Sequence, residues 1–165
     1  MPEQQIFCQI GWENSGAVLE VMLRHSEKLA VILRDPLQNS SKKLPSTEDL
    51  QAQILRLGLG ERVLLLEGSI PALLADLGEG FPDARIGVCF WAELVDYRTH
   101  LLQSLLLRDY LAEPALYLVD HCRYGSLAQS TLDLMGVDPA FHLQKAFPKL
   151  SQGIHLLSWD PQHRA

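Results

Sequence analysis

IFCQIGWENSGAVLEVML, residues 6–23, carries most of the information about the fold. Its apolar beginning, 6–10, predicts a buried strand, and the apolar residues after the turn recur at helical spacing. The turn runs from Gly11 to Gly16 and has the outline of G-x-G-x-x-G, with Glu13 where the middle glycine usually lies. Since a carboxylate at this position repels phosphates, the turn disfavours NAD and FAD and favours a cationic cofactor without phosphates. A plain strand-to-helix turn is the alternative interpretation.

Short apolar runs alternate with helical segments along the rest of the chain. Further strands are expected at 29–33, 63–66, 86–90, 115–119 and 154–159, and helices at 47–57, 71–77, 97–111, 126–135 and 139–147. Because nearly every residue of these strands is apolar, the pattern predicts an α/β protein with a doubly wound, mostly parallel, Rossmann-like sheet of about six strands and helices on both faces. We expect residues 1–165 to form a single domain, with a mobile loop at 36–46 and a tail at 160–165.

The composition excludes several classes of function. The net charge of −6 and the absence of a basic stripe in the sequence argue against a nucleic-acid partner. No apolar stretch approaches the ~20 residues of a membrane helix, and the N-terminus lacks the features of a signal peptide, so we expect no membrane partner. The three cysteines lack metal-binding spacing and suit reduced thiols, which predicts a cytoplasmic location. They are Cys8, Cys89 and Cys122.

The candidate site residues are the polar residues that follow the strands, because ligands of a doubly wound sheet bind beyond the carboxyl ends of its strands. Asp35 follows the second strand, where a carboxylate often holds a ribose; an Asp-Pro turn is the alternative. Glu93 follows the fourth strand, and Asp120 and His121 follow the fifth. His121 could act as a general base tuned by Asp120 or Glu93. The same side chains, with Asp96, could instead hold a divalent ion, although Asp96 more simply caps the next helix.

Three longer stretches carry a family resemblance. They are QIGWENSGAVLEVML (9–23), LGLGERVLLLEGSIPALLADL (57–77) and VCFWAELVDYRTHLLQSLLLRDYLAEPALYLVDHCRYG (88–125). In order and spacing they resemble class I S-adenosylmethionine-dependent methyltransferases, especially small-molecule O-methyltransferases of the catechol, caffeoyl-CoA and macrocin types. The similarity covers roughly residues 6–136.

The resemblance implies a cofactor, S-adenosylmethionine, and a reaction at a hydroxyl group of a small molecule. It places the substrate above Glu93, Asp120 and His121, with His121 taking the proton from the acceptor hydroxyl. The residues that it implies for cofactor binding are Gly11, Trp12, Glu13, Asn14, Gly16, Asp35, Gly68 and Ser69.

The chain departs from the family pattern at three positions. Gln9 replaces the acidic residue that ends the first strand, Leu33 replaces the carboxylate that holds the ribose, and Trp91 replaces an aspartate of the metal-dependent members. A bound divalent metal is therefore not expected. We also expect a reduced version of the fold, because only one strand is predicted after 115–119, where the family has an antiparallel pair.

Two classes of function stay open on this sequence. The first is an active methyltransferase. The second is a catalytically degenerate, methyltransferase-like scaffold that binds a protein partner or forms a homodimer, for which the apolar helix at 97–111 is the expected surface. A hydrolase using Asp120, His121 and Ser69 ranks third, because the chain has no G-x-S-x-G nucleophile elbow.

Overall fold

The computed structural model describes residues 4–13, 15–25, 28–37, 45–123 and 125–163. Most of the loop expected at 36–46 and the end of the expected tail lie outside these ranges. The strands are β1 (Gln4–Ile10), β2 (Ala30–Arg34), β3 (Val63–Glu67), β4 (Ala84–Trp91), β5 (Leu111–Val119), β6 (Phe141–Phe147) and β7 (Ile154–Trp159). The helices are α1 (Ser15–Arg24), α2 (Thr47–Arg56), α3 (Ile70–Gly80), α4 (Tyr97–Leu107) and α5 (Ser126–Val137), with short 3-10 turns at Arg108–Tyr110 and Pro161–His163.

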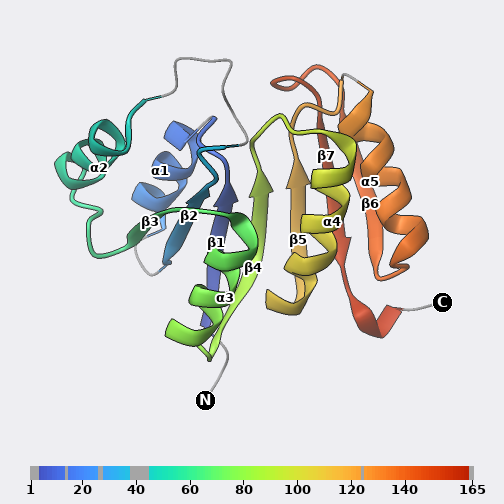
Figure 1. Cartoon of the computed structure of the whole chain (residues 1–165), viewed down its shortest axis with the longest axis horizontal. Coiled ribbons are helices and arrows are strands. Elements are labelled where there is room, and N and C mark those ends of the chain that lie inside the picture. The colour runs from blue at the N-terminus through green and yellow to red at the C-terminus, as the bar shows by residue number, and fades with distance from the viewer. Residues whose placement is uncertain (1–3, 14, 26–27, 38–44, 124, 164–165) are drawn as a thin grey trace.

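The strands form one twisted sheet in the order β3-β2-β1-β4-β5-β7-β6 (Figure 1). The pairs among β1 to β5 are parallel, and β7 runs antiparallel to both of its neighbours. The order of the strands reverses between β1 and β4, which is the point where ligands of such sheets bind. The predicted fold class, a doubly wound and mostly parallel sheet, is confirmed.

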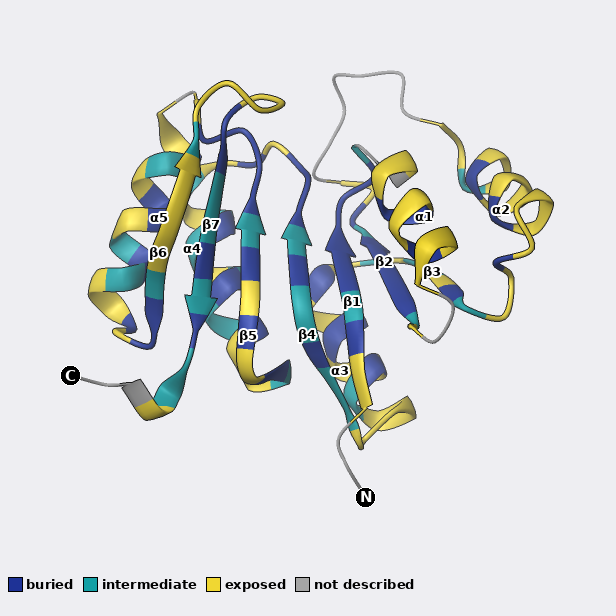
Figure 2. Cartoon of the chain, turned by 180° about the vertical axis from the view of Figure 1, so that it is seen from behind, coloured by how far each residue is buried: buried dark blue, intermediate teal, exposed yellow. Residues whose placement is uncertain are grey.

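The helices cover the two faces of the sheet unequally. Helices α3, α4 and α5 lie on one face (Figure 1), while α1 and α2 lie on the other face near β1, β2 and β3 (Figure 2). None of the described helices covers β4, β5, β7 and β6 on that second face, and Leu116 of β5 is 43% exposed. The core accordingly has two parts, one under α3 to α5 and a smaller one under α1 and α2.

Local sequence explains where two of the helices begin. Ser46 caps α2, and its hydroxyl and the Asp49 carboxylate form the reciprocal bonds of a capping box. Asp96 caps α4, since its carboxylate accepts from the amide of Thr99 at 3.0 Å. The simpler interpretation of Asp96 is therefore confirmed.

The helix predicted at 139–147 is wrong, because this segment is the strand β6. It pairs with β7 from Phe141, opposite Trp159, to Phe147, opposite Ile154. Most of its side chains are exposed, so the segment lacks the apolar pattern of a buried strand, and pairing with β7 rather than local propensity fixes its conformation. The sheet therefore has seven strands, and the antiparallel pair that was expected to be missing is present.

A polar cluster is buried between α4, α5 and β5. The Nδ1 atom of His100 lies 2.6 Å from the Ser130 hydroxyl, and its Nε2 atom lies 3.1 Å from the Tyr117 hydroxyl. Ser104 bridges to Tyr117 at 2.6 Å. Burial lowers the pKa of His100 to about 3, so the imidazole is neutral in the folded protein near neutral pH.

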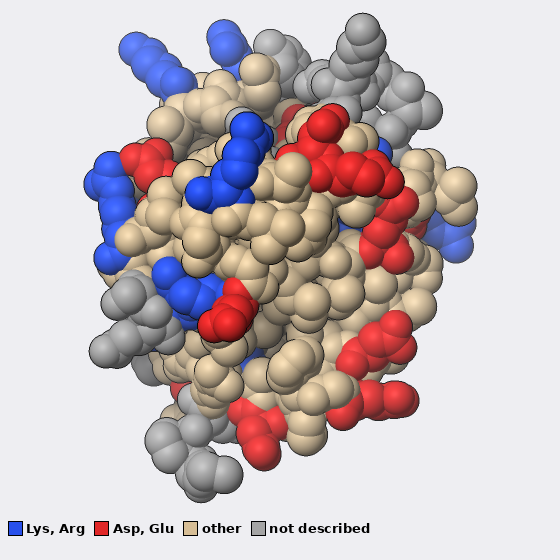
Figure 3. Space-filling view, turned by 90° about the vertical axis from the view of Figure 1, so that its left-hand side faces the viewer, with Lys and Arg blue, Asp and Glu red and all other residues tan. Residues whose placement is uncertain are grey.

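Surface charge, helix length and the state of the cysteines bear on the classes of partner discussed above. On the side of the molecule shown in Figure 3, both acidic and basic side chains occur, without a continuous basic surface. Within the described residues, no helix is both long and apolar enough to cross a bilayer. All three cysteines are free and buried, and burial raises the pKa of the Cys89 thiol well above its usual value.

Candidate active site

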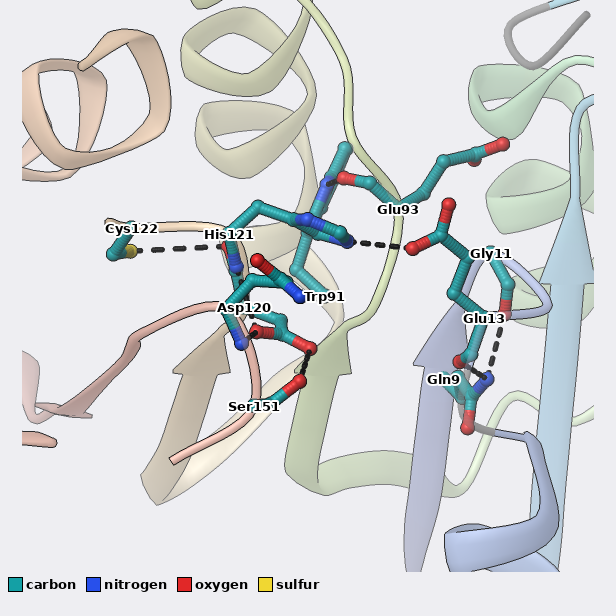
Figure 4. A network of polar contacts seen from close by, with 10 residues as sticks. Gln9, Gly11, Glu13, Trp91, Glu93, Asp120, His121, Cys122 and Ser151 are labelled. Carbon is teal, nitrogen blue, oxygen red and sulfur yellow. Dashed lines mark hydrogen bonds and ion pairs between the residues drawn. The ribbon is translucent and has the colours of Figure 1, made fainter. Parts of the chain in front are cut away.

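The carboxyl ends of β1, β4 and β5 lie level with one another. Ile10 pairs with Trp91, and Trp91 pairs with Val119. Backbone bonds continue this alignment one residue further, from the Ala92 amide to Ile10 and from the Asp120 amide to Trp91, both at 2.9 Å. The three loops that follow these strands therefore meet at the edge of the sheet where its strand order reverses (Figure 4).

The first of these loops is held by Gln9, which is fully buried. Its side-chain Nε2 donates to the carbonyls of Gly11, at 2.7 Å, and of Glu13, at 3.0 Å. Gly11 adopts φ +87°, a left-handed conformation that favours glycine. The residue that replaces the family's acidic side chain thus fixes the backbone of the turn.

The second loop packs directly against the first. The Cβ atom of Glu93 lies against Gly11, where a side chain on Gly11 would overlap it. The indole Nε1 of Trp91 donates to the Glu93 carbonyl at 2.8 Å and so fixes this loop from below. The Glu93 carboxyl group is buried and extends away from the His121 ring in Figure 4.

The third loop reaches across to the first through a close contact between the side chains of His121 and Glu13. The Nε2 atom of His121 lies 2.7 Å from a carboxylate oxygen of Glu13, and the side chains are only 4% and 10% exposed. His121 has φ +61°, which is uncommon for a residue with a side chain. The contact between Glu13 and His121 therefore links the loop after β1 to the loop after β5 (Figure 4).

Asp120 holds His121 in this unusual conformation. Its carboxylate accepts from the His121 amide at 2.7 Å and from the Ser151 hydroxyl at 2.8 Å, and it also receives the Gln152 amide at 3.3 Å. These bonds tie the loop after β5 to the turn between β6 and β7. Asp120 therefore fixes the backbone that carries the His121 side chain.

We expect Asp120→Ala to lower the free energy of unfolding by about 2 kcal/mol, because it removes the acceptor of three hydrogen bonds, one of them from the buried amide of His121. Ser151→Ala removes one of the same bonds from the donor side and should cost only about 1 kcal/mol. Urea denaturation of both variants measures the difference. Equal losses for the two variants would contradict the role of Asp120 as a shared acceptor.

The residues predicted for cofactor binding are only partly brought together. Trp12 is buried in the core under α1 and α2, with the guanidinium of Arg34 4.1 Å from its ring centre. The Asp35 carboxylate accepts from the Leu37 amide at 2.9 Å, as in the alternative Asp-Pro turn. Gly68 and Ser69 follow β3, two strands away from β1.

Two further positions, Asn14 and Gly16, were also predicted to bind the cofactor. Asn14 lies outside the described residues. Gly16 lies in the first turn of α1, and no atom lies within 4 Å of a Cβ atom built on it. The third glycine of the turn is therefore not required for helix packing, unlike the corresponding glycine of a dinucleotide-binding turn.

The described residues form four surface cavities, and none of them lies between the loops that follow β1, β4 and β5. The two with the most apolar surroundings have volumes of about 210 and 240 Å³ and include Gln4, Leu29 and Phe81, or Gln5, Val21 and Val88. None of the four is lined by Gly11, Glu93 or His121. Within the described part of the chain, no three His, Cys, Asp or Glu side chains gather as a metal site requires.

Sequence reasoning missed the residues that position this site. Ser151 and Gln152 were not singled out, because their turn between β6 and β7 was hidden by the helix predicted at 139–147. The available signal was Gly153, which adopts φ +88° and ends a turn that a hairpin needs.

Comparison with solved structures defines the class of fold. The chain has the fold of class I S-adenosylmethionine-dependent methyltransferases, as the sequence resemblance predicted. No protein-family profile matches the chain, and no curated protein matches it significantly in sequence.

Three solved structures illustrate the similarity. An O-methyltransferase from Bacillus cereus, in complex with S-adenosylhomocysteine, has a TM-score of 0.71 and 14% identity over 94% of this chain and 74% of its own. A TDP-rhamnose 3'-O-methyltransferase of calicheamicin biosynthesis has a TM-score of 0.65 and 14% identity, covering 94% and 72%. A methyltransferase from Geobacter sulfurreducens has a TM-score of 0.60 and 14% identity, covering 94% and 73%. These TM-scores establish the fold, whereas identities of 14% do not extend to activity.

Proposed function

We propose that this chain is an S-adenosylmethionine-dependent methyltransferase that acts on a hydroxyl group of a small molecule. The observation that carries the proposal is the meeting of Glu13 and His121 at the edge where the strand order reverses, in a fold shared with O-methyltransferases. We further propose that the activity belongs to one domain, residues 1–165, of a cytoplasmic protein.

The chemistry of the site fits the cationic end of this cofactor. Glu13 places a carboxylate that is 10% exposed at the loop after β1, and a poorly solvated carboxylate favours a positively charged partner. The ammonium and sulfonium groups of S-adenosylmethionine are such partners, whereas the phosphates of NAD or FAD are not. Asp35 is the nearby candidate for the ribose, although its Oδ1 atom already accepts from Leu37.

The residues of the chain have separate roles in this proposal. Bound S-adenosylmethionine supplies an electrophilic methyl group to the acceptor oxygen. His121 would take the proton of the acceptor hydroxyl at Nε2 once the hydrogen between Nε2 and the Glu13 carboxylate, which lie 2.7 Å apart, has passed to that carboxylate. Asp120 holds the His121 backbone, and Gln9 holds the turn that carries Glu13. Methyl transfer depends mainly on holding donor and acceptor in line, so one base and a fixed loop suffice.

Calorimetric titration with S-adenosylhomocysteine tests the proposal directly. We expect binding in the micromolar range, and at about 100 times the dissociation constant the ligand should stabilise the protein by about 2.7 kcal/mol. Transfer to a panel of hydroxylated small molecules should then fall at least about 100-fold in His121→Gln, the usual loss when a general base is removed. No binding at high micromolar ligand would refute the assignment.

The second candidate function is a non-catalytic scaffold. Its supporting observation is that the protein's own groups occupy the edge of the sheet: Glu93 packs on Gly11, and Glu13 binds His121. In this proposal α4, whose Leu102 is 53% exposed, would contribute to a homodimer or bind a protein partner. Sedimentation at working concentration distinguishes the dimer from a monomer, and a strict monomer would count against the homodimer.

A further inference from the structure

We infer that β3 is an interaction surface at which a second copy of this chain adds its own β3, so that two sheets join edge to edge in an antiparallel strand pair. The inference goes beyond the proposed function and does not depend on it. β3 lies at one end of the strand order (Figure 1) and, within the described residues, is hydrogen-bonded to β2 alone. Its outer side therefore presents backbone donors and acceptors that another extended strand can satisfy.

The first argument is the difference between the two edges of the sheet. β6, at the opposite edge, carries Lys145, and its register against β7 shifts between Leu143 and Lys145. A lysine and a bulge are features that keep an edge strand from pairing with another chain. β3 has neither feature, because it pairs with β2 in regular register and reads Val-Leu-Leu-Leu-Glu. The edge at β3 is therefore the one suited to pairing.

The second argument is the apolar surface that adjoins this edge. Leu64 pairs with Val31, which belongs to the core under α3 to α5, so both side chains point to that face of the sheet. Leu64 is nevertheless 39% exposed, and with Leu29 and Phe81 it lines the cavity of about 210 Å³. Leu66, on the same face, is only half-buried. A strand added at this edge would cover apolar side chains as well as backbone groups.

The third argument identifies the added strand as a second β3. Opposite residues of an antiparallel pair lie on the same face, so two copies related by a two-fold axis pair about a single residue. With Leu65 at the axis, Leu65 faces its equivalent, and Leu64 of each copy faces Leu66 of the other. An axis at Leu64 would instead place Glu61 opposite Glu67, which is a repulsive pair of like charges. An axis at Leu66 would place Glu67 opposite Leu65, so one register of self-pairing is favoured over its neighbours.

Sedimentation equilibrium over a series of protein concentrations tests this interface. An interface built on one strand pair is small, so we expect a reversible equilibrium between monomer and dimer. Leu64→Lys introduces the charge that protected edge strands carry and should weaken the dimer by about tenfold or more. Leu143→Lys is the matched control, because Leu143 is 40% exposed on the opposite edge strand, and the same change there should leave the dimer unaffected.

Amide hydrogen exchange on the unmodified protein guards against variants that fail to fold. The amides of β3 that point away from β2 should exchange more slowly as the protein concentration rises, because the second copy accepts their hydrogen bonds. The amides of β6 that point away from β7 should exchange at the same rate at every concentration.

Three results would overturn the inference. The first is a protein that stays monomeric at every soluble concentration. The second is a dimer that Leu102→Lys on α4 weakens and Leu64→Lys does not, because the interface would then lie on α4. The third is exchange of the β3 amides that does not depend on concentration. None of these results bears on cofactor binding, so the proposed function would stand or fall on its own titration.

Discussion

Replacing Gly11 by alanine is expected to lower the free energy of unfolding by about 3 kcal/mol. Two effects add: a left-handed backbone costs a residue with a side chain roughly 1–2 kcal/mol, and overpacking costs about 1–3 kcal/mol. An added Cβ atom would overlap the Cβ of Glu93 and lie 3.1 Å from its backbone nitrogen. For a chain of this length, a loss of about 3 kcal/mol lowers the melting temperature by roughly 6–12 °C.

Gly16→Ala is the matched control for this variant. Gly16 belongs to the same turn, but no atom lies within 4 Å of a Cβ atom built there, and the residue is helical. The stability should stay unchanged or rise by up to about 1 kcal/mol, the difference in helix propensity between glycine and alanine. Calorimetry on both variants measures the two changes in melting temperature. A melting temperature within about 2 °C of the unmodified chain, which corresponds to a loss of only about 0.5–1 kcal/mol, would show that the loop carrying Glu93 shifts easily to accommodate a side chain at Gly11.

The stability of the protein should fall steeply below pH 6.5 because of His100. Burial lowers the pKa of this imidazole from 6.5 to about 3 in the folded state. Between these values the unfolded chain binds a proton that the folded chain does not, so its contribution is complete above pH 6.5 and is lost as the pH falls toward 3. The loss is about 1.4 kcal/mol for each pH unit, or about 3 kcal/mol at pH 4.5.

Urea denaturation across this range, in parallel with His100→Gln, isolates the effect from the titration of carboxylates. The variant should be less stable at pH 7.5, because the buried hydroxyls of Ser130 and Tyr117 each lose one of their two hydrogen-bond partners. Its stability should depend on pH less steeply, by about 1.4 kcal/mol per unit. An identical slope in both proteins would mean that His100 takes up its proton without unfolding.

The fold could be predicted from the sequence wherever a strand is a run of apolar residues. Such runs predict β1 to β5, although the described helices leave one face of β4 and β5 uncovered, and the amphipathic segments between them require right-handed crossovers to parallel neighbours. The polar strand β6 could not be predicted in this way. Its side chains are mostly exposed, and only its pairing with β7 distinguishes it from a helix.

The candidate site was predictable as a set of positions but not as a set of contacts. The rule that ligands lie beyond the carboxyl ends of strands selected Glu13, Glu93, Asp120 and His121. The catalytic roles of these residues stay predictions. The contacts that hold them are visible only in the structure, where Asp120 accepts from the His121 backbone amide and the Glu93 side chain extends away from the His121 ring.

The amino-acid sequence alone predicts an α/β sheet and the edge at which a ligand of such a sheet binds, because both follow from local patterning. It also predicts that the first turn is unsuited to phosphates, because Glu13 carries a negative charge. The partnership of Glu13 with His121 depends on folding, since 107 intervening positions separate them in the chain and the level ends of β1, β4 and β5 bring them to 2.7 Å. The same alignment leaves no room for a side chain at position 11, because pairing of β1 with β4 brings the Cβ atom of Glu93 against Gly11. Contacts of this kind depend on strand order and register, which no local pattern encodes.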